Sequence, residues 1–185
     1  MFRSAPRYIA VQAAVEFFVN AALNGAIGWY WTSGLEHMPL WGWPSAALDL
    51  LPTGFGIALL LSLAFTWRFH RRLRAGTTAP AARYPGRVPG FVHRLPLNAW
   101  WRCGLIGLAG AVLAVVLLMA LQAAGTRTLE RWDFILLKTV FAALVATGAM
   151  LIAGYRALGD GVTPQRPMGY WTDRPAGKRD LRKSP

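Results

Sequence analysis

Cysteine and histidine are scarce in this chain of 185 residues. There is one cysteine, Cys103, and there are three histidines. A single thiol excludes a disulfide within the chain and any metal site built from several cysteines. Three histidines are too few for a di-iron desaturase, and none lies inside a long apolar run, where a membrane haem would need axial ligands. We therefore expect neither a metal nor a cofactor.

Catalytic signatures are missing as well. The sequence contains no G-x-S-x-G, no P-loop and no H-E-x-x-H, the patterns that place a nucleophile, a phosphate or a zinc ion. Catalysis by a known motif is therefore unsupported. An enzyme that acts on lipid with Asp49 or Glu16 as its acid or base stays open, without a motif behind it.

Long apolar runs dominate what is present. Apolar residues make up 55% of the chain, and the mean hydropathy is +0.33. A helix needs about 20 mostly apolar residues to cross a bilayer, and its backbone groups must be paired within the segment. Buried helices of a soluble bundle would need polar faces, which the last two runs lack. We predict an all-α, polytopic membrane protein with helices at about 8–30, 45–67, 103–124 and 134–155.

Basic residues flank these runs unevenly. Lys and Arg are frequent before the first run, between the second and third, and after the fourth, but scarce in the other two connections. By the positive-inside rule, the helices form two hairpins with both termini in the cytoplasm. We expect a transmembrane domain over 1–159 with a cytoplasmic Arg- and Pro-rich loop at 68–99. A basic, disordered tail would follow at 160–185.

The net charge of +12 could in principle indicate binding to nucleic acid. Here the basic residues flank membrane helices on one side, so attraction to anionic lipid headgroups accounts for them, at about 1 kcal/mol per residue. We expect no nucleic-acid partner. The residues expected to contact anionic lipid are Arg68, Arg71, Arg72 and Arg74.

The first run carries a polar stripe, made up of Gln12, Glu16, Asn20 and Asn24. Steps of four residues advance a helix by about 400°, so the stripe stays on one face, which must point at protein or water. One interpretation is an ion path or proton relay. The other is a helix contact, in which each amide contributes about 0.6 kcal/mol. The pattern favours the helix contact.

Two opposite charges interrupt later runs at matching depth. Asp49 lies six residues after Trp43, and Lys138 lies six residues after Trp132, so both sit about 9 Å below an interfacial Trp. We predict that they form an ion pair with Asn24 nearby. The alternative is that Lys138 extends to the outer surface and Asp49 lies in a hydrated notch. The equal spacing also fits a duplicated hairpin, although chance could produce it.

The order of three segments supports the topology. NAALNG lies in the first run, PLWGWPSAALDLLPTG leads into the second, and RFHRRLRAG follows it. This order resembles a set of small four-helix bacterial inner-membrane proteins. The resemblance implies a fold and a location, and it carries no activity and no catalytic residue.

Two functional classes remain from the sequence. We expect a membrane protein that acts through helix–helix association, as a homo-oligomer or as an accessory subunit of a membrane complex. The alternative is a small transporter or channel whose polar path uses Glu16, Asn20, Asn24 and Asp49. Neither class names a substrate or a partner.

Overall fold

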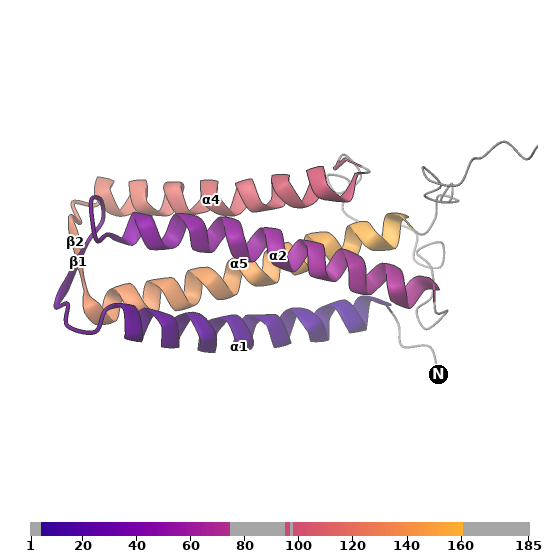
Figure 1. Cartoon of the computed structure of the whole chain (residues 1–185), viewed down its shortest axis with the longest axis horizontal. Helices are drawn as coiled ribbons and strands as arrows, with labels where there is room; N and C mark the ends of the chain where they lie inside the picture. The colour runs from indigo at the N-terminus through magenta and orange to yellow at the C-terminus, as the bar shows by residue number, and fades with distance from the viewer. Residues whose placement is uncertain (1–4, 75–94, 97, 161–185) are drawn as a thin grey trace, which may run out of the picture.

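Four long helices and a two-stranded ribbon make up the part of the fold that the computed structural model describes, residues 5–74, 95–96 and 98–160 (Figure 1). The first hairpin consists of α1 (Ala5–Trp31), β1 (His37–Pro39) and α2 (Ala46–Arg74). The second consists of α4 (Ala99–Ala123), β2 (Thr128–Glu130) and α5 (Arg131–Asp160). Both hairpins run between the same two ends. The ribbon end carries β1 and β2, and the terminal end carries the start of α1 and the end of α5 (Figure 1).

The helices extend beyond the apolar runs. α2 continues through Arg68 to Arg74, which the sequence placed in the central loop, and α4 begins at Ala99. Hydropathy marks only the part of a helix inside hydrocarbon, whereas the backbone stays helical where charged and aromatic side chains meet headgroups. Asn98 caps α4 by accepting a hydrogen bond from the Trp100 amide at 3.0 Å. Most of the expected loop and nearly all of the tail lie outside the described residues.

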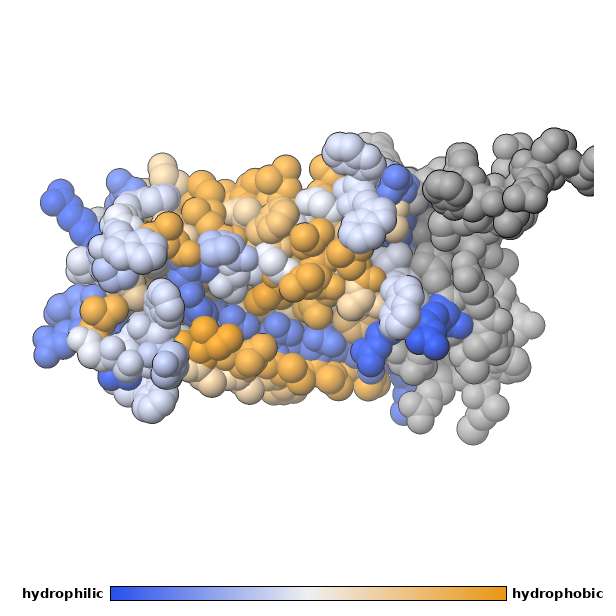
Figure 2. Space-filling model, in the orientation of Figure 1, coloured by the Kyte–Doolittle hydropathy of each residue, from blue (hydrophilic) through white to orange (hydrophobic). Residues whose placement is uncertain are grey.

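Apolar residues dominate the middle of the helices. All four helices in the described part of the chain are long and apolar enough to cross a membrane. On the face seen in Figure 2, hydrophobic residues fill most of the middle region between hydrophilic ends, and a row of hydrophilic residues crosses this apolar band. Exposed tryptophans lie at both margins: Trp29, Trp43 and Trp132 toward the ribbon end, and Trp67, Trp100 and Trp101 toward the terminal end. This is the surface of a multi-pass membrane protein.

Packing joins the hairpins to each other. α1 packs on α5, α4 packs on α2, and α2 packs on α5, so the helices lie in the order α1, α5, α2, α4. If α1 is exchanged with α4 and α2 with α5, the same set of helix contacts results. The two hairpins are therefore arranged as in an approximate two-fold. β1 and β2 pair antiparallel with Met38 opposite Leu129, so the ribbon also joins the two hairpins. The outer helices α1 and α4 therefore each have one main neighbour.

Small residues set the closest helix contact. A Cβ built on Gly54 of α2 would lie 2.6 Å from the carbonyl oxygen of Gly110 in α4. Only glycine allows two backbones to approach this far, and such contacts replace hydrophobic driving force between helices in lipid. At the terminal end, a separate core cluster brings α1, α2 and α5 together; its members include Ile9, Ala13, Phe65, Phe69, Met150 and Ala153.

Candidate functional site

An intramembrane ion pair joins the two central helices. Lys138 Nζ of α5 donates to Asp49 Oδ1 of α2 at 2.5 Å. The Lys138 side chain is 2% exposed and the Asp49 side chain 14% exposed. The lysine stem passes close to α1, because a Cβ on Gly28 would lie 3.4 Å from Lys138 Cδ. Lys138 therefore points into the protein and does not extend to the surface.

Local sequence places Asp49 where its charge is stabilised. Asp49 lies in the first turn of α2, where the unpaired amides and the helix dipole favour a negative group. Ser45 precedes the helix and accepts a hydrogen bond from the Leu48 amide at 3.3 Å, as a capping residue does. Lys138 and the start of α2 thus both place positive potential beside Asp49.

The polar stripe of α1 bonds mostly along its own helix. Asn24 Nδ2 donates to the Asn20 carbonyl at 3.0 Å, and Asn20 Nδ2 donates to the Glu16 carbonyl at 3.0 Å and to Glu16 Oε2 at 3.2 Å. Asn20 and Asn24 are buried, whereas Gln12 and Glu16 are half-buried. Within the described residues no hydrogen bond joins the stripe to the ion pair, because the hydrogen bond from the Asn24 amide stays within α1.

A cleft opens beside Asp49, between the ribbon ends of α1 and α2. We call it the Asp49 cleft; its volume is about 430 Å³, and its lining includes Ile27, Trp31, Trp43, Ser45, Asp49 and Thr53. Asp49 Oδ2, the oxygen that Lys138 does not bind, has no hydrogen-bond partner among the described residues. The cleft therefore combines indole and aliphatic walls with an acceptor that is not satisfied.

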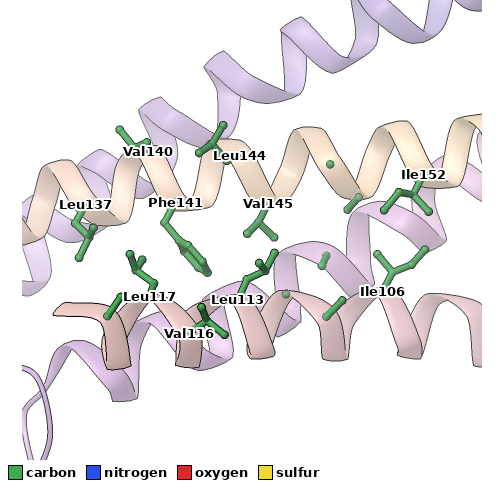
Figure 3. Close-up of a pocket in the computed structure, with 16 residues that line it drawn as sticks. Ile106, Leu113, Val116, Leu117, Leu137, Val140, Phe141, Leu144, Val145 and Ile152 are labelled. Atoms are coloured by element: carbon green, nitrogen blue, oxygen red, sulfur yellow. The ribbon is translucent and has the colours of Figure 1, made fainter. Parts of the chain in front are cut away.

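A second, larger hollow lies between α4 and α5. We call it the α4/α5 groove; its volume is about 540 Å³, and α2 contributes Ala58 to its lining. Figure 3 shows Leu113 and Leu117 of α4 facing Phe141 and Val145 of α5 across it. Gly110, Gly148 and Ala149 leave room in its lining. All of its lining side chains are apolar.

The expected lipid-contact arginines lie at the terminal end. Arg68 and Arg71 are exposed, and the Arg71 guanidinium lies 4.8 Å from the ring centre of Trp67, within cation–π distance. Arg72 and Arg74 follow in the last turn of α2. In the described part of the chain, no three His, Cys, Asp or Glu side chains gather in a way that could hold a metal.

Sequence reasoning missed three contributors to this region. Thr53 lies four residues after Asp49 on the same face of α2, and Ser45 lies four residues before it, directly ahead of the helix; that spacing could have identified them. Gly28 was missed because no local pattern reveals that a lysine stem from another helix packs on it. No protein-family model matches the chain, and no curated protein or solved structure matches it either.

Proposed function

We propose that this chain acts in the bacterial inner membrane through helix–helix association, as a homo-oligomer or as an accessory subunit of a larger membrane complex. The α4/α5 groove carries the proposal. It is an apolar concave surface with small residues among its lining, which lets another transmembrane helix approach closely. α4 packs mainly on α2, so much of its own surface faces away from the fold.

The intramembrane polar groups support association over transport. Asn20 and Asn24 bond along α1 and are buried. Lys138 and Asp49 bond to each other across α2 and α5. A path for an ion needs polar groups that face a common water-filled space, whereas the amides of Asn20 and Asn24 are used within α1 and the ion pair joins α2 to α5. The transporter or channel is the second candidate, and the free oxygen of Asp49 is the observation that favours it.

The proposed orientation follows from charge. With Arg68 and Arg71 at the terminal end, both termini would be cytoplasmic and these side chains would meet anionic headgroups. The ribbon end would then face the periplasm. The resemblance to small four-helix inner-membrane proteins supports the same location.

Native mass spectrometry of nanodiscs cut directly from cell membranes tests the proposal. A second copy in the particle supports the homo-oligomer, and a different protein at fixed stoichiometry supports the accessory subunit. Gly148 lines the groove, and a Cβ there meets nothing within 4 Å, so the side chain of Gly148→Leu starts in open space and extends into the groove. Gly104 in α4 is equally open but is not part of the groove lining, so Gly104→Leu is the matched control.

We expect Gly148→Leu to remove most of the associated protein and Gly104→Leu to leave it in place. A wild-type chain that emerges only as a monomer with lipid would contradict association. If Gly148→Leu and Gly104→Leu reduce the associated protein equally, the α4/α5 groove is not the surface through which the chain associates.

A further inference from the structure

The Asp49 cleft holds more polar groups than the ion pair uses. Asp49 and Thr53 line it from one face of α2, and Ser45 lines it from the residue before that helix. Thr32, Thr139 and Thr147 each donate to the carbonyl four residues earlier. Thr53 makes no such bond within the described residues, so its hydroxyl remains available to a ligand.

Pro52 adds another acceptor. Proline has no amide hydrogen, so Pro52, which lies inside α2, cannot donate to the carbonyl of Leu48 as a helical residue normally does. Leu48 and Pro52 both line the cleft. The Leu48 carbonyl therefore lacks its usual helical donor. Asp49 Oδ2 is buried and has no hydrogen-bond partner among the described residues.

Charge limits what these groups can bind. Lys138 already neutralises Asp49, and the start of α2 adds positive potential. A cationic ligand would introduce a positive charge with no counter-charge of its own, which is costly in a poorly hydrated site. A neutral ligand with hydroxyl groups meets no such cost, because hydroxyls both donate to the acceptors and accept from Thr53.

The walls select an amphiphile. Trp31 and Trp43 provide indole surfaces. A ligand's sugar ring or glycerol unit would pack its carbon face against them, with its hydroxyls toward α2. Ile27 and Leu48 are apolar and exposed, which suits an acyl chain leaving toward the bilayer. The cleft, at about 430 Å³, falls within the range of about 300–1,000 Å³ typical of ligand pockets.

We propose that the Asp49 cleft binds the uncharged polyhydroxyl headgroup of an amphiphile, with Asp49 Oδ2 and the Leu48 carbonyl accepting from hydroxyls and Thr53 donating to one. This site goes beyond helix association and does not depend on it. The groove between α4 and α5 lies elsewhere, so either proposal can fail without the other.

The test uses the full chain in nanodiscs, with adducts read by native mass spectrometry. The probe is monoglucosyl dioleoylglycerol, the matched control is the same lipid with its hydroxyls methylated, and a dioleoyl lipid with a quaternary ammonium headgroup tests the charge argument. We expect retention of the glucosyl lipid at least about ten-fold above both others, as the loss of several hydrogen bonds implies.

Variants locate the binding. Thr53→Val removes one hydroxyl without touching the ion pair and should weaken retention about five-fold, the value of one neutral hydrogen bond. Thr147→Val is its control on α5 and should change nothing. Trp43 is 82% exposed, so Trp43→Leu removes one wall without disturbing the core and should also weaken retention. Equal retention of the methylated lipid, preference for the ammonium lipid, or no change in Thr53→Val and Trp43→Leu would each overturn the site.

Discussion

Lys138 of α5 binds Asp49 of α2 across 89 residues of sequence and inside the apolar band of the protein. Each residue lies on the helix that its hairpin contributes to the centre of the fold. The pair therefore connects the two hairpins where they meet. Its burial makes it the strongest single candidate for the interaction that fixes which helices pack together.

Removing one member of the pair should destabilise the protein much more than removing both. Lys138→Met leaves the Asp49 carboxylate without its counter-charge, and breaking a buried pair costs about 3–5 kcal/mol. The double variant Lys138→Met with Asp49→Leu leaves no charge behind and should recover most of that loss. Unfolding in mixed micelles measures both free energies. Equal losses in the single and double variants would show that the pair is solvated.

The contact between α2 and α4 should be intolerant of any side chain. A Cβ on Gly110 would collide with the Gly54 carbonyl oxygen, so Gly110→Leu must push the helices apart. We expect the free energy of unfolding to fall by about 1–3 kcal/mol or more, as for overpacked cores. Gly104→Leu in the same helix meets open space and should be close to neutral in the same measurement. If both variants unfold alike, the close approach is not present in the membrane.

Glu16 should contribute little beyond its contact with Asn20. Glu16→Gln keeps an oxygen that can accept from Asn20 Nδ2 within α1, so the contact is retained and we expect a stability change below about 0.5 kcal/mol, the size of a pair four residues apart on one helix. Assembly in nanodiscs should be unchanged. A proteoliposome in which wild-type protein supports proton-linked flux, and the Gln variant does not, would instead establish Glu16 as part of a transport path.

Cysteine labelling tests the orientation. In a Cys103→Ala background, Glu36→Cys at the ribbon end and Arg71→Cys at the terminal end each introduce one exposed thiol. With an impermeant maleimide on intact spheroplasts, we expect only the thiol at position 36 to react. The thiol at position 71 should react after the membrane is opened. The opposite pattern would invert the topology that the Arg distribution predicts.

Hydropathy and charge were enough to predict the helices but not how they pack. The runs located all four helices because the length and apolarity of a membrane span are local properties. The pairing of Asp49 with Lys138 was also accessible, since equal distances from Trp43 and Trp132 place both at one depth. The β ribbon was not predicted, because three-residue strands in each loop leave no periodic pattern.

The sequence also did not predict that each helix packs mainly on helices of the other hairpin and not on its own hairpin partner. This packing depends on Gly54 meeting Gly110 and on Lys138 packing over Gly28, contacts between distant segments. Thr53 escaped notice for a different reason. A threonine in a membrane helix usually donates to its own backbone, and only the structure shows that this one does not.

Site-specific photo-crosslinking in living cells tests helix association most directly. A photoreactive amino acid replaces Leu144, an exposed residue of the α4/α5 groove, or Val19, an exposed residue of α1 outside it. We predict one discrete protein adduct at position 144, at twice the mass of the chain for a homo-oligomer or at a partner's added mass, and none at position 19. Lipid adducts alone at position 144 would contradict association through this groove.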